Sequence, residues 1–230
     1  MKLSIIIPVY NERKYIRTIL AKVKKVDIGE VKKEIIIVDD CSQDGTRDIL
    51  RKLKGYTILY HPKNRGKGAA IRTGLEHATG DILLIQDADL EYDPNDYPKL
   101  LKRILSGEAQ VVYGSRFKGK LFHRETLAIP THYIGNRTLS LMTTLLYGQW
   151  VTDMETCYKM FTREVLSKLN LTAERFDFEP EITAKILKLG YRIHEVPISF
   201  HPRDWKQGKK INWRDGVKAL YCLAKFRIID

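Results

Sequence analysis

The chain has few cysteines and no long apolar run. Its three cysteines, Cys41, Cys157 and Cys222, are far apart and odd in number, which excludes a disulfide framework and a zinc-type spacing and is typical of a reducing cytoplasm. The longest uncharged stretch, 138–152, has 15 residues, fewer than the ~18–20 that span a bilayer. The apolar run near the N-terminus is about five residues long, below the ~7–15 of a secretory leader. We therefore expect no transmembrane segment and no leader.

The sequence also lacks linkers and repeats. No Gly/Ser tract, proline-rich run or internal repeat divides the 230 residues, and 43% of them are hydrophobic, enough for a substantial core. We therefore predict a single domain with a C-terminal extension.

Acidic residues are in the minority, and the formal net charge is +12. Residues 201–230 alone hold eight Lys or Arg against three Asp, a net charge of +5. An excess of this size indicates an anionic partner, which could be a nucleic acid, an acidic membrane surface or a phosphorylated substrate.

The first half of the chain alternates between buried-strand and amphipathic-helix patterns. Short runs of β-branched residues predict strands at 3–10, 34–40, 56–61, 81–86 and 109–116. Helical periodicity lies between them at 12–26, 44–55, 66–80 and 94–107. Such alternation builds a mostly parallel sheet with helices on both faces, so the predicted fold class is α/β and Rossmann-like.

The second half is less regular. Residues 176–190 favour a helix and 192–202 a strand, while 139–150 is either a core helix or an interfacial one. Residues 214–229 form an amphipathic helix on which apolar side chains share one face: Val217, Leu220, Tyr221, Ala224 and Ile228.

Polar residues follow four of the predicted strands. In an open parallel sheet, ligands bind beyond the carboxyl ends of the strands. The densest group is "DADLE", where Asp87, Asp89 and Glu91 follow a buried strand and need a cationic partner. Carboxylates at this spacing suit Mg²⁺ or Mn²⁺, completed by substrate phosphates. A solvated acidic turn before a helix is the simpler alternative.

Four sequence motifs, in this order and spacing, extend this interpretation. "IIIPVYNE", "IIIVDDCSQDGT", "NRGKGAAIRTGLEHATGD" and "DADLEYDP" resemble the family 2 glycosyltransferases, which have the GT-A fold, and more narrowly the dolichyl-phosphate mannose synthase group. The resemblance continues through "VYGSRF", "TDMETCYKMF", "FEPEI" and "EVPISF" over nearly all of the chain. It implies a GT-A domain at 1–200, with a nucleotide-binding half at 1–118 and an acceptor half at 119–200, followed by a basic loop and an amphipathic helix at 201–230.

The resemblance also implies roles for single residues on the donor side. The residues expected to bind the nucleotide sugar are Pro8, Tyr10, Glu12, Val38, Asp40, Lys67, Asp87, Ala88 and Asp89. Among them, Val38 and Asp40 would contact the base, and Asp89 would hold the metal together with Glu91 and Asp87. Many relatives have Gln in place of Glu91. The basic loop would close over the diphosphate through Arg203, Lys209 and Lys210, because fixed cations stabilise a departing diphosphate.

On the acceptor side, the resemblance implies that Arg116 faces a phosphate, with Arg124 and Arg137 as further candidates. Asp153 is the candidate base or acceptor-positioning residue. Asp153 and Glu155 stand where relatives have an Asp followed by Ser-Gly-Phe, so this region departs from the family pattern. A structural carboxylate paired with Lys159 or Arg163 is the other interpretation of Asp153.

The expected function is therefore metal-dependent, inverting transfer of a sugar, with mannose from GDP-mannose as the first expectation, onto a polyprenyl or dolichyl phosphate. Transfer from UDP-glucose or UDP-N-acetylglucosamine to a saccharide hydroxyl is the alternative. A nucleotidyltransferase would have a glycine-rich loop after its first strand, and "PVYNE" has none. An RNA-binding module would not explain the acidic residues, so no nucleic-acid partner is expected. Basic amphipathic segments would hold the enzyme peripherally at the cytoplasmic face of the membrane.

Overall fold

The computed structural model describes residues 1–118, 130–203 and 213–229, which fold around one mixed sheet. Its seven strands are arranged in the order β3-β2-β1-β4-β6-β5-β7. The strands are β1 (Lys2–Val9), β2 (Lys32–Asp39), β3 (Thr57–Tyr60), β4 (Ile82–Ile85), β5 (Val111–Ser115), β6 (Lys159–Thr162) and β7 (Ile193–Pro197). Parallel pairing joins β1 to β2 and β4, β2 to β3, and β5 to β7. The predicted α/β fold class, a mostly parallel sheet with helices, is confirmed.

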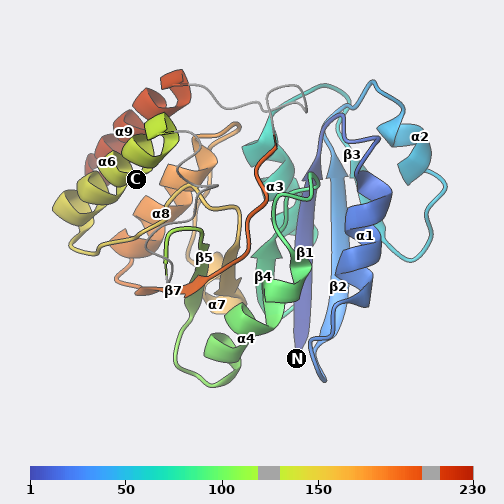
Figure 1. The fold of residues 1–230 in the computed structure, drawn as a ribbon, viewed down its shortest axis with the longest axis horizontal. Helices are drawn as coiled ribbons and strands as arrows, with labels where there is room; N and C mark the ends of the chain where they lie inside the picture. The colour runs from blue at the N-terminus through green and yellow to red at the C-terminus, as the bar shows by residue number, and fades with distance from the viewer. Residues whose placement is uncertain (119–129, 204–212, 230) are drawn as a thin grey trace.

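Helices lie on both faces of this sheet. Helices α1 (Ile16–Lys25) and α4 (Tyr97–Leu105) lie in front of it in Figure 1, and α3 (Lys67–His77) lies behind. A 3₁₀ turn, η1 (Pro94–Asp96), precedes α4, and α2 (Thr46–Leu50) and α7 (Arg163–Ser167) are short. The central strands carry Ile, Leu and Val because both of their faces are buried. All four residues of β4 are buried, for example.

A separate layer of helices lies beside the β5–β7 end of the sheet. It consists of α6 (Pro130–Tyr147), α8 (Phe178–Lys188) and α9 (Trp213–Ile228), which pack against one another (Figure 1). The layer has its own apolar cluster, made of Leu139, Met154, Ala184, Ala219, Cys222, Leu223 and Phe226. The C-terminal segment is therefore packed onto the domain through α9.

Two of the departures from the sequence predictions concern β6 and α9. Strand β6 was not predicted, and it pairs antiparallel with both β4 and β5, between which it lies. Its four residues follow a polar turn and give too short a pattern to be recognised. On α9, Val217, Tyr221 and Ile228 of the predicted apolar face are 57%, 70% and 84% exposed, because the helix packs through the neighbouring stripe that contains Ala219 and Leu223.

Two helical glycines allow a matched test of this packing. A Cβ on Gly74 of α3 would lie 2.5 Å from Ile6 Cγ2 in β1, whereas a Cβ on Gly216 of α9 would meet no atom within 4 Å. We expect Gly74→Ala to lower the free energy of unfolding by about 1–3 kcal/mol through overpacking. Gly216→Ala should raise it by about 0.5–1 kcal/mol through helix propensity. Urea unfolding measures both, and equal effects of the two substitutions would contradict the packing of α3 on β1.

Candidate functional site

The loops after β1 and β2 are tied together at the carboxyl edge of the sheet. The backbone N–H of Asn11 donates to Ser42 Oγ at 2.9 Å, and that of Glu12 donates to Thr46 Oγ1 at 3.0 Å. Asn11 has a positive φ of 56°, which turns the chain sharply after the strand. These bonds place the residues predicted to line the nucleotide pocket beside the second loop, which carries Asp39 and Asp40.

Asp40 anchors the loop that leads into α3. One carboxylate oxygen accepts from the N–H of Arg65 at 2.8 Å, the other accepts from Gly66 at 2.7 Å, and His61 Nδ1 lies 2.8 Å from the first. Gly66 has a φ of +100°, and a Cβ there would lie 2.4 Å from the carbonyl oxygen of Glu174. Three protein partners surround Asp40, and its predicted contact with a base stays a prediction.

No binding role was predicted for Asp39 itself. In the structure, one oxygen of its carboxylate has no hydrogen-bond partner. Its Oδ2 accepts from Arg47 Nε at 2.7 Å and from the N–H of Ser42 at 3.3 Å. Its Oδ1 is buried and has no hydrogen-bond partner. Buried polar atoms are rarely left unpaired, so Oδ1 is a candidate acceptor for a ligand N–H. In the sequence, Asp39 and Asp40 are adjacent and look alike.

Val38 and Pro8 are register partners on β2 and β1. Val38 is fully buried in the core, while Pro8 and Tyr10 are partly exposed. Ala88, in the turn after β4, is only 4% exposed. The predicted donor residues are therefore brought to one region, but they differ in how far they face solvent.

Lys67 forms an ion pair with Asp87, the first carboxylate of the acidic turn at 87–91. Its Nζ lies 2.9 Å from Asp87 Oδ1 and 3.2 Å from Glu179 Oε1, which joins the N-terminus of α3 to β4 and α8. Burial disfavours the ammonium charge, but the two carboxylates outweigh it and raise the pKa of Lys67 well above its usual range. The predicted placement of Lys67 near the nucleotide stays a prediction.

Arg203 lies among the other carboxylates of the acidic turn. Its Nη2 is 2.7 Å from Asp89 Oδ2, its Nη1 is 3.3 Å from Glu12 Oε2, and its backbone N–H donates to Glu91 Oε1 at 2.8 Å. Burial, together with the charges of Asp87 and Glu91, raises the pKa of Asp89 to about 7, and Arg203 opposes this rise. The predicted metal ligands Asp89 and Glu91 are thus brought together around a cationic side chain.

The fit of this site to a divalent ion can be judged from these contacts. Within residues 1–118, 130–203 and 213–229, no three His, Cys, Asp or Glu side chains are placed to hold an ion by themselves. Asp89 and Glu91 supply hard oxygen ligands, and Arg203 is a stand-in cation between them. Mg²⁺ is usually bound by one or two carboxylates with substrate phosphates completing the shell. The residues therefore fit an ion that arrives with a diphosphate.

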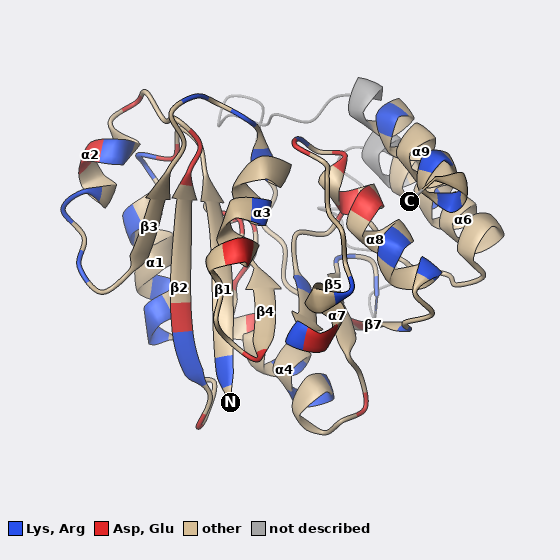
Figure 2. Ribbon diagram, turned by 180° about the vertical axis from the view of Figure 1, so that it is seen from behind, with Lys and Arg blue, Asp and Glu red and all other residues tan. Residues whose placement is uncertain are grey.

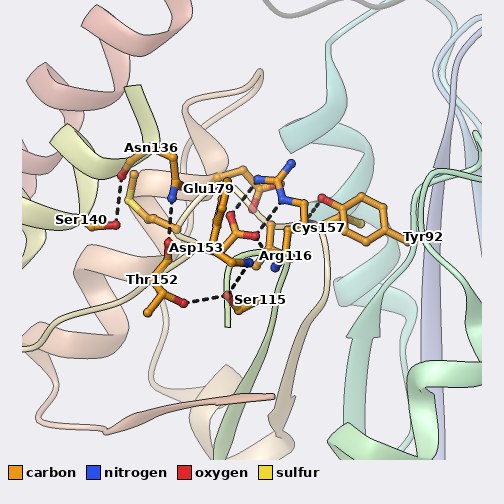
Figure 3. Close-up of polar contacts among 12 residues, drawn as sticks. Tyr92, Ser115, Arg116, Asn136, Ser140, Thr152, Asp153, Cys157 and Glu179 are labelled. Atoms are coloured by element: carbon orange, nitrogen blue, oxygen red, sulfur yellow. Dashed lines mark hydrogen bonds and ion pairs between the residues drawn. The ribbon is translucent and has the colours of Figure 1, made fainter. Parts of the chain in front are cut away.

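On the predicted acceptor side, Arg116 and Asp153 form a two-point ion pair in which Asp153 is fully buried and Arg116 is 17% exposed (Figure 3). Arg116 Nε donates to Asp153 Oδ2 and Nη2 donates to Oδ1, both at 2.7 Å, and the backbone N–H of Arg116 also donates to Oδ2 at 2.9 Å. Burial disfavours the guanidinium charge, but Asp153 outweighs it and raises the pKa of Arg116 well above its usual range. Asp153 is therefore paired with Arg116 rather than with Lys159 or Arg163.

Polar side chains fix this pair in place. Ser115 Oγ lies 2.7 Å from Thr152 Oγ1, and Asn136 of α6 donates to the carbonyl of Thr152 at 2.7 Å (Figure 3). Glu195 of β7 accepts from the backbone N–H of Thr152 at 2.9 Å. Oδ1 of Asn136 is buried and has no hydrogen-bond partner, which makes it another group that can face a ligand.

Glu155 and Lys159 complete the buried charges of this region. Lys159 is fully buried, forms an ion pair with Glu179 and donates to the carbonyls of Met154 and Thr156. Burial, and secondly the charge of Glu179, raises the pKa of Glu155 to about 7, and Glu155 Oε1 has no hydrogen-bond partner. Glu155 thus has a carboxylate oxygen without a hydrogen-bond partner, whereas both oxygens of Asp153 accept from Arg116.

The remaining predicted cations are Arg137, Arg124, Lys209 and Lys210. Arg137 lies with its guanidinium 5.8 Å from the ring centre of Trp150. Arg124, Lys209 and Lys210 fall outside the described residues, so their predicted roles stay predictions.

Comparisons with known proteins show which family the chain resembles. The model of the glycosyl transferase family 2 matches residues 4–169. The UDP-N-acetylglucosamine–dolichyl-phosphate N-acetylglucosaminyltransferase of Methanococcus voltae is 32% identical, over 97% of this chain and 95% of its own length. The low-salt glycan biosynthesis hexosyltransferase Agl6 of Haloferax volcanii is 28% identical, over 88% of this chain and 48% of its own.

A solved structure is similar in fold. It is the glucosyl-3-phosphoglycerate synthase of Mycobacterium tuberculosis in complex with Mn²⁺, UDP and phosphoglyceric acid, with a TM-score of 0.75 and 20% identity over 100% of this chain and 79% of its own. At this identity the likeness supports the GT-A-like fold alone. The acidic turn, the loops beside it and the family match over most of the chain lead to one conclusion: the chain belongs to glycosyl transferase family 2.

Proposed function

We propose that this protein transfers a sugar from a nucleoside diphosphate carrier to the phosphate of a polyprenyl phosphate such as dolichyl phosphate, inverting the anomeric carbon. The observation that carries the proposal is the cluster of Asp89, Glu91 and Arg203 at the carboxyl edge of the sheet, which suits a metal-bound diphosphate. The name of the Methanococcus voltae relative supports a dolichyl phosphate acceptor. Mg²⁺ or Mn²⁺, held by Asp89 and Glu91, would neutralise charge on the diphosphate.

A phosphate acceptor needs little activation. The second ionisation of a phosphate monoester is near pH ~6, so an oxyanion is already present at neutral pH. The residues of the chain then have to align that oxygen behind the sugar and stabilise the departing diphosphate. Because Asp153 is held at both oxygens by Arg116, its role is to position that guanidinium. This arrangement favours a reaction that needs no general base.

For the donor, the sequence predicts GDP-mannose, whereas two findings favour a uridine nucleotide. Asp39 offers a single unpaired acceptor, because Arg47 and Ser42 occupy its other oxygen. Uracil presents one N–H on its pairing edge, whereas guanine presents two adjacent donors. The Methanococcus voltae relative is named for a UDP sugar. We therefore propose a UDP sugar as donor, ahead of GDP-mannose.

A second candidate is transfer to a saccharide hydroxyl, which requires a general base. The unpaired oxygen of Glu155 and the pKa of about 7 of that carboxyl favour this alternative, since a base near the working pH is the most effective. The base would be Glu155 rather than the predicted Asp153.

Membrane contact is proposed for one surface of the helical layer. Apolar side chains that point away from the core on α6 and α9 define this α6–α9 surface: Ile134, Leu141, Leu145, Val217, Tyr221 and Ile228. Exposed Lys218, Lys225 and Arg227 accompany them on α9, where basic residues are blue in Figure 2. Within the part of the chain that is described, no helix is both long and apolar enough to cross a bilayer. Interfacial contact at the cytoplasmic face would bring the enzyme to its lipid acceptor.

Nucleotide binding is the first test. We expect Mn²⁺ with UDP to raise the melting temperature more than Mn²⁺ with GDP, and a ligand at ~100 times its Kd to stabilise the fold by roughly 2.7 kcal/mol. Asp89→Ala should abolish the manganese-dependent part of the shift, whereas Asp48→Ala, an exposed carboxylate on α2, should leave it unchanged. If no nucleoside diphosphate stabilises the protein, the proposed function is wrong.

The acceptor is tested by comparing dolichyl phosphate with dolichol in a transfer assay with a labelled sugar nucleotide. Product is expected from the phosphate alone, and Glu155→Gln should change that rate less than about tenfold, because no base is needed. A hydroxyl acceptor would instead make Glu155→Gln lose about 10²–10⁴-fold. Asp153→Asn is less clean, because it leaves the largely buried Arg116 without its charged partner and should cost about 3–5 kcal/mol of unfolding free energy.

Vesicle flotation tests the α6–α9 surface. The protein should bind vesicles with anionic lipid at low salt, and the double variant Leu145→Glu/Tyr221→Glu should reduce the partition coefficient at least about tenfold, because it removes apolar burial and adds charge. Leu105→Glu on α4, where the leucine is 46% exposed, is the matched control and should bind like the unaltered protein. Equal binding by all three proteins would contradict this surface.

A further inference from the structure

The segment that follows β7 crosses the acidic turn and is held there by its backbone. The N–H of Ser199 donates to Asp96 Oδ2 at 2.7 Å, Phe200 forms a β-bridge with Tyr92, and the N–H of His201 donates to the carbonyl of Glu91 at 2.9 Å. These contacts fix residues 199–201 before Arg203 is reached. Arg203 is therefore placed over the turn by main-chain bonds as well as by its own charge.

The Arg203 guanidinium then bonds to the oxygens that a divalent ion would need. It contacts Asp89 at 2.7 Å and Glu12 at 3.3 Å, and its Nε is 3.8 Å from Glu91 Oε1. The side chain is only 12% exposed, and it lies with its guanidinium 5.7 Å from the ring centre of Tyr15. A guanidinium remains protonated in proteins, so Arg203 can leave these carboxylates only by moving.

We propose that Arg203 occupies the place of the divalent ion until a nucleoside diphosphate binds, so that metal and donor bind together and not metal first. A bare ion has to displace Arg203 from Asp89 and Glu91, which removes two of the carboxylates that offset the charge of this largely buried cation and is costly. A diphosphate removes that cost, because its oxygens offer the displaced guanidinium a new anionic partner in a fork-shaped geometry. The inference rests on the proposed function and adds an order of binding to it.

The arrangement also explains why a third carboxylate is tolerated in the turn. Glu91 adds a negative charge beside Asp87 and Asp89. In this chain the added charge has its own partners, the N–H and Nε of Arg203. With Arg203 in place, the turn is stable without metal, and with Arg203 displaced, its carboxylates repel one another unless a cation takes over.

The test measures Mn²⁺ binding, without turnover, by the loss of the free-ion signal in electron paramagnetic resonance. Without nucleotide, Arg203→Met should bind Mn²⁺ at least about tenfold more tightly than the unaltered protein, because the competing cation is gone. With UDP present, the same variant should bind the Mn²⁺–UDP pair more weakly, because the diphosphate has lost a partner. The Mn²⁺ affinities of Arg203→Lys should lie between those of the unaltered protein and of Arg203→Met, since lysine keeps the positive charge but lacks the two-pronged guanidinium.

Arg192→Met, which removes an exposed arginine just before β7, is the matched control and should change neither affinity. If Arg203→Met leaves binding of the bare ion unchanged or weakens it, Arg203 does not exclude the metal and the inference is wrong. If the unaltered protein binds Mn²⁺ as tightly alone as with UDP, it is wrong as well. Either result leaves the proposed function intact, provided that the protein still binds Mn²⁺ together with a nucleoside diphosphate. The proposed function itself is wrong if neither UDP nor GDP binds in the presence of Mn²⁺.

Discussion

Carboxylates gathered at the end of a buried parallel sheet need cations, and this constraint governs the site. Asp87 and Asp89 follow β4, whose four residues are all buried, so neither carboxylate is fully solvated. Two cations from other parts of the sequence neutralise these carboxylates. Lys67 forms an ion pair with Asp87, and Arg203 forms one with Asp89. Both cations were predicted to lie at the donor site, so in the proposed function the same side chains would neutralise the turn and bind a diphosphate.

The first of these ion pairs continues into the acceptor side. Lys67 also binds Glu179, and Glu179 binds Lys159, which donates to carbonyls of the loop between Asp153 and Cys157. This buried chain of alternating charges connects the turn after β4 to the acceptor loop. Removing Lys67 would take away the cation beside Asp87 and leave Glu179 paired with Lys159 alone, so Lys67 connects the two regions.

The acceptor side is also built around a paired charge. Arg116 alone would be a strong phosphate ligand, but Asp153 holds it at two points and limits where it can reach. Such a pair suits positioning better than proton transfer, which is the reason why we propose a phosphate acceptor. Glu155, with a pKa raised to about 7, keeps the hydroxyl alternative chemically reasonable.

The sequence by itself determined the family, the α/β class, the extents of most central elements and the residues of the acidic turn, because these depend on local periodicity and on short motifs. It did not determine β6, whose four residues are a strand only because β4 and β5 lie on either side of them. It also did not separate Asp39 from Asp40 or the packed stripe of α9 from the exposed one. The partners of Arg203 lie 112 to 191 residues away, and those of Arg116 lie 37 away. Only the tertiary structure decided these pairings, because charge pairing and burial depend on distance in space and no local pattern records which distant segments meet.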